Sequence, residues 1–239
     1  MKSLKILFLL LVLLFSVKYS YAYEKLDFFD KFHIYTPYIY ILQDETTIEK
    51  VKILLLFHDN TTIQNNEQEI LNFDKEAANW ESFTEKDKIF IMGFDLEQDK
   101  SFEEKEDMDK IVKRILIEVD RMKNTCGTKD IEIYTAGTNF GGNIALLFNL
   151  IYDNFNGALC MNISKPSKFI EKNLKKCKNK KFYFFHCDKN KDMSASKVNS
   201  LKKKLIKKGA VAETFIYKNS KDILPEDAYF DAIDEISKK

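Results

Sequence analysis

Six short apolar segments follow one another between about residue 50 and the end of the chain. They are Lys52–His58, Lys88–Phe94, Ile131–Ala136, Gly157–Asn162, Lys181–Cys187 and Ala212–Tyr217. Each has the length of a strand and is apolar at nearly every position, which is typical of strands that are buried on both faces. The pattern therefore predicts a central sheet that is mostly parallel.

The segments between these runs have the apolar spacing of helices. Residues 108–122 place Ile111 and Ile115 on one stripe, because residues three or four apart share a helix face. Residues 194–209 repeat the pattern and end in a glycine, and residues 225–239 begin with proline and two acids and end in lysines, as helix termini favour. Strands that alternate with helices predict right-handed crossovers. We therefore expect an α/β fold of three layers with a doubly wound, mostly parallel sheet.

Two segments near the amino terminus have other patterns. Residues 30–45 alternate imperfectly and predict an extra edge strand or hairpin. Residues 1–22 combine basic residues, the apolar run Ile6–Val17 and small residues near Ala22, the layout of a secretory signal peptide. A membrane anchor is the alternative, but the run is shorter than the roughly 20 residues that span a bilayer. We expect cleavage after Ala22, a secreted or lumenal protein, and no membrane span after cleavage.

Composition and charge bear on the domain organisation of the chain and on the kind of partner that it could bind. No linker rich in Gly, Ser or Pro interrupts the chain after the signal segment, so residues 23–239 are expected to form a single domain. The 38 basic and 37 acidic side chains give a net charge of +1, and no overall field points to a nucleic acid. The lysine-rich stretches 172–181 and 197–209 are interpreted as solvated helix faces and a basic patch, with an anionic partner as the alternative.

The chain has four cysteines, Cys126, Cys160, Cys177 and Cys187. In a secretory protein they permit three disulfide pairings, and the choice among them stays open. Cys160 lies in an apolar run and is expected to be a buried side chain. Cys126 and Cys177 each lie in a polar loop before a strand and are the pair to test first. The sequence has no C-x-x-C pair and no histidine cluster, so we expect no metal site and no cofactor.

The segment Tyr134–Phe148, YTAGTNFGGNIALLF, lies at the junction of a predicted strand and a predicted helix. Gly137 and Gly141 stand two residues before and two residues after Asn139, the spacing of a G-x-S-x-G turn that presents a nucleophile. Small residues are needed there because the turn is tight. Asn139 occupies the serine position, and its amide has no nucleophilic oxygen.

Other segments follow in the order of a known family. The run LLLFHDN at residues 54–60 resembles the strand before an oxyanion loop, and residues 182–217 resemble a strand, His-Gly-Asp-x-Asp, a helix and a strand. The segment YKNSKD at residues 217–222 falls where a catalytic histidine follows in that family. From Lys52 to the C-terminus the chain resembles the α/β-hydrolase superfamily. It is most similar to the phospholipase/carboxylesterase group that includes acyl-protein thioesterases, and the resemblance implies the α/β-hydrolase fold.

The resemblance places the catalytic triad at Asn139, Asn190 and Asp222. A Ser-His-Asp triad works because the base takes the proton of the nucleophile and the acid stabilises the imidazolium. Two amides and a carboxylate offer no such proton route, and the loss of one member typically costs several powers of ten in rate. We therefore predict that no catalytic triad is intact.

The resemblance also places two backbone oxyanion donors, at Asn60 and at Phe140. Asp59 stands where the family has a glycine. Its carboxylate would repel a developing oxyanion, so a working oxyanion hole is not expected.

His58 and Cys187 are the candidates for a relocated catalytic pair, because each ends a predicted strand at the edge where α/β sheets bind ligands. His186 is adjacent to Cys187 in the sequence. Neighbours on a strand point to opposite faces, so His186 is not expected to serve Cys187.

These features favour a secreted pseudoenzyme that has the α/β-hydrolase fold without its triad and serves in binding or interaction. Its partner is unknown, either a protein or an acyl or apolar ligand. The first alternative is an active carboxylesterase, acyl-thioesterase or phospholipase-type hydrolase with a non-standard nucleophile. The second is a structural subunit of a secreted complex.

Overall fold

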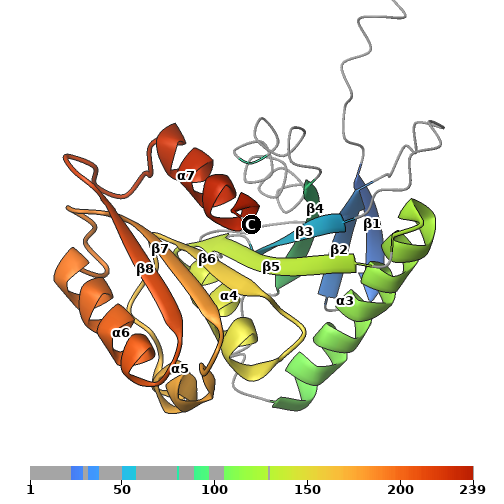
Figure 1. Ribbon diagram of the computed structural model, residues 1–239, viewed down its shortest axis with the longest axis horizontal. Helices are drawn as coiled ribbons and strands as arrows, with labels where there is room; N and C mark the ends of the chain where they lie inside the picture. Colours follow the sequence, from blue (N-terminus) through green and yellow to red (C-terminus); the bar gives the residue numbers. More distant parts are fainter. Residues whose placement is uncertain are drawn as a thin grey trace, which may run out of the picture.

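The central sheet of the computed structural model has eight strands in the order β1-β2-β4-β3-β5-β6-β7-β8 (Figure 1). The structure describes residues 23–28, 32–37, 50–57, 80, 89–96, 105–128 and 130–238. The strands are β1 (Tyr23–Phe28), β2 (Phe32–Pro37), β3 (Lys50–Phe57), β4 (Ile89–Leu96), β5 (Asp130–Thr138), β6 (Gly157–Met161), β7 (Lys181–Cys187) and β8 (Val211–Tyr217). β1 and β2 pair antiparallel at one edge and β2 joins β4 antiparallel, whereas all pairs from β4 to β8 are parallel.

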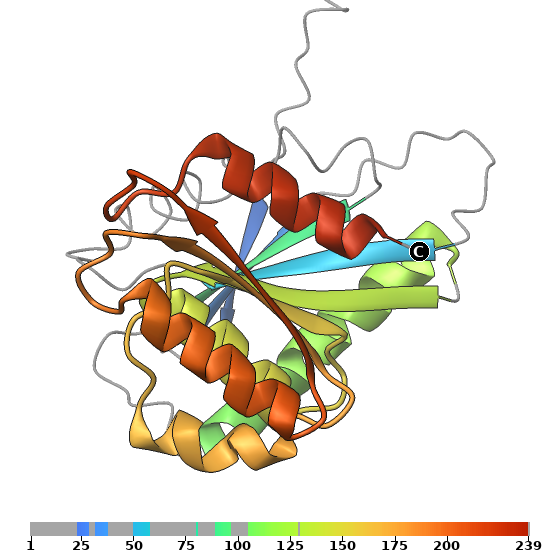
Figure 2. The same cartoon turned by 60° about the vertical axis from the view of Figure 1, so that its left-hand side comes forward.

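Helices cover both faces of the sheet and give three layers (Figures 1 and 2). They are α3 (Lys105–Cys126), α4 (Phe140–Ile151), α5 (Lys168–Asn173), α6 (Ala195–Lys207) and α7 (Glu226–Ser237), with the 3-10 helix η1 (Leu174–Lys176) after α5. Among these described helices, only α7 packs on one face, and α3 to α6 pack on the other. Within the same part of the chain, no helix combines the length and the apolar character needed to cross a bilayer.

Two apolar cores fill the spaces between the sheet and its helices. They form on both faces because alternate residues of each strand point to opposite sides. In the core beneath α4, the ring of Phe57 lies 5.0 Å from that of Phe148. In the core beneath α7, the ring of Trp80 lies 5.0 Å from that of Tyr229, edge to face. Both faces of the central strands are therefore closed to water.

The expectations for the fold class are confirmed. All six apolar runs form strands, and their ends differ from the predicted ends by at most two residues. Residues 30–45 contain β2, which pairs with β1, and β1 lies before the predicted segment and forms the edge of the sheet. Gly209 has φ +89° just after α6, the left-handed conformation in which helices often end. The expected signal peptide, residues 1–22, lies outside the described residues and stays a prediction.

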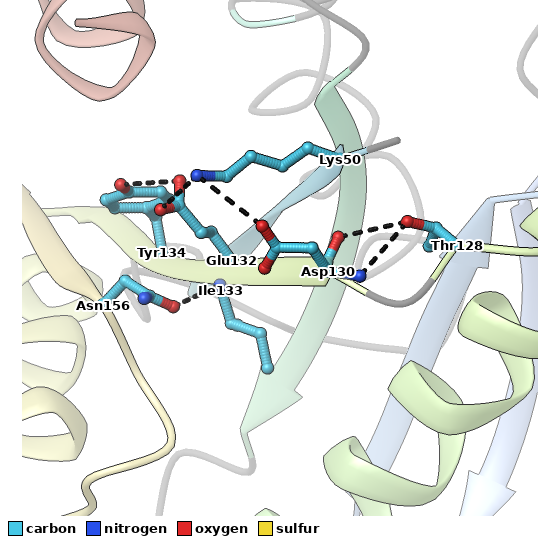
Figure 3. A network of polar contacts seen from close by, with 7 residues as sticks. All are labelled: Lys50, Thr128, Asp130, Glu132, Ile133, Tyr134 and Asn156. Atoms are coloured by element: carbon cyan, nitrogen blue, oxygen red, sulfur yellow. Dashed lines mark hydrogen bonds and ion pairs between the residues drawn. The ribbon is translucent and has the colours of Figure 1, made fainter. Parts of the chain in front are cut away.

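A polar network joins β3 to β5 at their amino ends (Figure 3). Lys50 Nζ lies 2.8 Å from Glu132 Oε1 and 4.0 Å from Asp130 Oδ2, and Tyr134 donates a hydrogen bond to Glu132 Oε2 at 3.2 Å. The hydrogen bond with Glu132 raises the pKa of Lys50, and burial together with the Glu132 charge raises the pKa of Tyr134. Asn139 lies beyond the opposite end of β5, so this network fixes strand register away from the candidate site.

Candidate functional site

The turn between β5 and α4 has a strained backbone at its tip. Asn139 has φ 50° and ψ −109°, a conformation outside the left-handed helical region and one that few residues adopt. Its N–H donates to Met161 O at 2.9 Å, and its carbonyl accepts from the N–H of Asn143 at 3.2 Å. Strain of this kind persists only where the surrounding structure imposes it, and it concentrates at functional sites. The surrounding structure therefore holds the backbone of Asn139 in a strained conformation at the tip of this turn.

Gly137 and Gly142 keep that turn closed. A Cβ on Gly137 would lie 2.4 Å from Phe57 O and 2.6 Å from Gly141 O. A Cβ on Gly142 would lie 2.8 Å from Gly137 O. All these contacts are with backbone atoms, which cannot move aside as a flexible side chain does. The first turn of α4 thus approaches β3 and β5 only because these positions lack side chains.

Asn162, which follows β6, connects the loops of the candidate site. Its side chain is fully buried and its φ is 44°. Asn162 Oδ1 accepts from the N–H of Cys187 at 2.8 Å, and Nδ2 donates to Asp222 O at 3.0 Å and lies 3.2 Å from Cys187 Sγ. The backbone N–H of Asn162 donates to Phe185 O at 2.8 Å. One asparagine therefore joins the ends of β6 and β7 to the loop before α7.

Asn190, at the expected acid position, forms a turn within its own loop. Its Oδ1 accepts from the N–H groups of Asp192 and Met193, both at 3.0 Å, and the side chain is buried. Its own N–H donates to Cys187 O at 3.3 Å. A carboxylate oxygen would accept the same two bonds, so the amide preserves the turn. The amide lacks the negative charge that stabilises an imidazolium.

Asp222, at the expected histidine position, has an exposed side chain and is fixed through its backbone carbonyl, which accepts from Asn162. The loops that carry Asn139, Asn190 and Asp222 follow the carboxyl ends of β5, β7 and β8, and β6 lies between β5 and β7 in the sheet. The carbonyl of Met161 accepts a hydrogen bond from the N–H of Asn139. The side chain of Asn162 bonds to Cys187, the last residue of β7, and to the carbonyl of Asp222. The structure thus brings the three loops to one edge of the sheet and couples them through the end of β6.

Phe140 is the first residue of α4, directly after the strained turn. Its N–H is therefore among the first of the helix, where backbone donors lack a partner from the preceding turn. The other expected oxyanion position, Asn60, and the expected rescue residue His58 lie outside the described residues. Asp59, expected to oppose an oxyanion, lies outside them as well.

Cys187 is a buried thiol in a setting that opposes its ionisation. The side chain is fully buried, and Sγ lies 3.4 Å from Ile223 O. Burial raises the pKa of Cys187, and the negative charges of Asp222 and Asp188 raise it further, although the hydrogen bond from Asn162 acts in the other direction. A nucleophilic cysteine needs the thiolate form. This environment therefore disfavours the thiolate that Cys187 would need in order to act as a nucleophile.

His186 lies on the opposite face of β7 from Cys187. His186 Nε2 is 2.6 Å from Met193 O, on the side of α6, whereas Cys187 belongs to the core beneath α7. The carbonyl only accepts, so Nε2 carries the proton and Nδ1 is the unprotonated nitrogen. The two neighbours therefore form no catalytic pair, as strand alternation requires.

The other described cysteines are also free. Cys160 and Cys177 are fully buried thiols, and burial raises the pKa of each. Cys177 Sγ lies 3.5 Å from Leu205 O in the core beneath α6. The expected Cys126–Cys177 disulfide is therefore not formed, because the side chain of Cys177, directly after η1, is buried in the core. Cys160 is buried as expected.

Buried His186 makes stability depend on pH. Its Nδ1 is buried without a hydrogen-bond partner among the described residues, and burial lowers the pKa of the ring. The unfolded chain takes up a proton near pH 6.5, whereas the folded protein resists it. The contribution of neutral His186 to the free energy of unfolding is therefore complete above about pH 6.5. It is lost as the pH falls from there toward the lower pKa of the folded protein.

We expect the urea midpoint of the protein to fall between about pH 6.5 and pH 5, and to fall less steeply in His186→Gln. The substitution itself lowers the stability at every pH. The two proteins are therefore compared by how steeply the urea midpoint changes with pH, and not by the midpoint at one pH. Equal slopes in the two proteins would contradict this account of His186.

Within the described part of the chain, no group of three or more His, Cys, Asp or Glu side chains is arranged to hold a metal ion.

No protein-family model matches the sequence, and no curated protein is significantly similar to it. Solved structures resemble the fold across nearly the whole chain. Esterase 2 of Thermogutta terrifontis, phosphorylated by paraoxon, has a TM-score of 0.63 and 12% identity, and the match covers 90% of this chain and 91% of that chain. An esterase of Pyrococcus furiosus has a TM-score of 0.57 and 10% identity over 91% of both chains. Est1E of Butyrivibrio proteoclasticus has a TM-score of 0.56 and 13% identity over 90% of this chain and 99% of that chain.

At such low identity the likeness concerns the fold. The parallel strands of the sheet, the helices on both faces and the strained turn after β5 agree with it. The chain therefore has the α/β-hydrolase fold.

Proposed function

We propose that the protein is a non-catalytic α/β-hydrolase-like protein that binds a protein partner or an acyl or apolar ligand. The observation that carries the proposal is Asn139 at the tip of a fully formed nucleophile turn. The backbone has the shape that serves catalysis in this fold, and the side chain has no nucleophilic oxygen. Fold and chemistry are separable in this way, because function resides in the site and not in the fold.

The partner positions support the same proposal. Asn190 uses its side-chain oxygen to close a turn, and Asp222 is held only by its backbone carbonyl. Neither position carries a histidine that could take a proton from residue 139. An active hydrolase with a relocated nucleophile would need another ionisable group, and the thiol of Cys187 is buried with a raised pKa.

The first test is for turnover and for labelling. The purified protein is incubated with a fluorophosphonate probe, a thiol-directed probe and nitrophenyl esters of short and long acyl chains. We expect no label from the fluorophosphonate, slow labelling of thiols until urea is added, and ester hydrolysis at the rate of buffer. Hydrolysis above that rate that disappears in Cys187→Ala would overturn the proposal in favour of the active-hydrolase alternative.

The second test restores the triad. The triple variant Asn139→Ser, Asn190→Asp, Asp222→His supplies a nucleophile, an acid and a base at the assigned positions. We expect its ester hydrolysis to exceed that of a matched triple variant with Asn139→Ala by at least about tenfold, a small part of what an intact triad contributes. A folded triple variant with no gain over its control would contradict the assignment of the three positions.

We also propose that residues 1–22 are a cleaved signal peptide, that the protein is secreted or lumenal, and that residues 23–239 form one domain. The start of β1 at Tyr23, the residue after the expected cleavage site, supports this. Mass spectrometry of the protein purified from a secreting eukaryotic host should find Tyr23 at the amino terminus. A mature chain that retains residues 1–22 would favour the membrane-anchor alternative.

A further inference from the structure

Basic and acidic residues are unevenly distributed along the chain, although its net charge is small. Residues 165–208 hold sixteen lysines and three acidic residues, whereas the rest of the chain holds 22 basic and 34 acidic residues. The segment includes α5, η1 and α6, and α5 and α6 are neighbours on the same face of the sheet (Figures 1 and 2). This segment therefore carries a net charge of +13.

A pocket of about 150 Å³ lies within this basic segment, between α6 and the start of α5. Three lysines, Lys165, Lys197 and Lys204, line the pocket together with Ser200, and Glu171 is its single acidic lining residue. Lys197, Ser200 and Lys204 are three and four residues apart and so share one face of α6. In the described part of the chain, none of the three lysines forms an ion pair, so their charge is available to a ligand.

The floor of the pocket is apolar. Met193 and Leu201 line it and are only 4% and 5% exposed. A volume of about 150 Å³ accommodates a single aromatic ring or a short alkyl group. The pocket thus offers positive charge and a small apolar surface.

We propose that this pocket binds the phosphate group of a small phosphate monoester, with the apolar substituent against Met193 and Leu201. A phosphate monoester carries a charge of about −1.5 to −2 at neutral pH, which matches several cations better than a carboxylate does. A concave site with charge of one sign also concentrates the field and raises the local concentration of the opposite ion. The surrounding lysines of residues 165–208 add to that field.

Met193 connects the pocket to the candidate site. Its N–H bonds to Asn190 Oδ1, and its carbonyl accepts from His186. A ligand that packs against Met193 therefore contacts the loop that carries the former acid position. None of the pocket residues is a triad position, so the proposal stands independently of the non-catalytic assignment.

The proposal is tested by calorimetric titration of the full mature chain with phenyl phosphate. The pocket variant Lys165→Gln, Lys197→Gln, Lys204→Gln is compared with the matched variant Lys172→Gln, Lys203→Gln, Lys207→Gln, which loses the same charge from exposed positions outside the pocket. We expect the pocket variant to bind at least about tenfold more weakly and the matched variant less than about threefold. Ser200→Phe, which fills the pocket and keeps the charge, should also lose binding.

Vesicles of phosphatidylcholine with a minor fraction of phosphatidic acid distinguish the source of the phosphate. Vesicle binding that is lost in the pocket variant and retained in the matched variant supports the pocket and assigns a lipid headgroup. Binding of phenyl phosphate without binding of vesicles supports the pocket and assigns a soluble ligand. Equal losses in the two lysine variants, or binding of neither probe, would overturn the proposal.

Discussion

Gly137→Ala is expected to destabilise the protein by about 3 kcal/mol or more, or to prevent folding. A Cβ at this position would lie 2.4 Å from Phe57 O and 2.6 Å from Gly141 O, far inside van der Waals contact. The clash involves backbone atoms of β3 and α4, so relief requires a shift of the helix or of a central strand. Packed interiors resist such shifts.

The measurement is urea denaturation followed by fluorescence. Trp80 is the only tryptophan of the chain, and it packs on Tyr229 of α7, so its emission reports on the core across the sheet from α4. Gly209→Ala is the matched control, because Gly209 has a positive φ but an added Cβ would meet only the side chain of Lys178 closely, at 3.3 Å. We expect the control variant to lose about 1 kcal/mol in the free energy of unfolding. Similar losses in the two variants would contradict the steric account of the turn.

Asn162→Ala is expected to lower the free energy of unfolding by about 3 kcal/mol. The substitution leaves the buried N–H of Cys187 and the partly buried carbonyl of Asp222 without their side-chain partner. It also puts alanine at φ 44°, a region that alanine disfavours. The loss should appear in the urea midpoint and, locally, as faster amide exchange in residues 187–193 and 218–224.

Two controls separate the causes at this position. Asn162→Gly removes the hydrogen bonds without the penalty for positive φ, and we expect about 2 kcal/mol. Asn219→Ala places alanine at φ 63° on the exposed loop after β8, and we expect about 1 kcal/mol or less. If Asn162→Gly is as stable as the wild type, the buried hydrogen bonds do not couple the loops.

Much of the fold follows from local patterns in the sequence. The run of apolar residues in Gly157–Met161 predicts a buried strand because a strand covered on both faces has no polar side to show. The separation of His186 from Cys187 follows from strand geometry alone. The turn at Asn139 is recognisable because glycines at fixed spacing reflect a steric requirement that is itself local.

Features that depend on contacts across the sheet could not be predicted in this way. The only signal for Asn162 was a polar residue directly after an apolar strand, and its partners come from β7 and from the loop before α7. Cys177 was expected in a solvent-exposed loop, but its side chain turns into the core beside Leu205. Net charge concealed the basic segment because acidic residues elsewhere cancel it in the total.

The backbone at residue 139 is held in place by its neighbours and not by its own side chain. Gly137 and Gly142 allow the close approach of the turn to Phe57, Gly141 and each other, and the backbone hydrogen bonds of residue 139 with Met161 and Asn143 help to impose its strained conformation. The shape of the turn therefore does not depend on the side chain that residue 139 carries, so a substitution there changes the chemistry of the site more than it changes the folding of the chain.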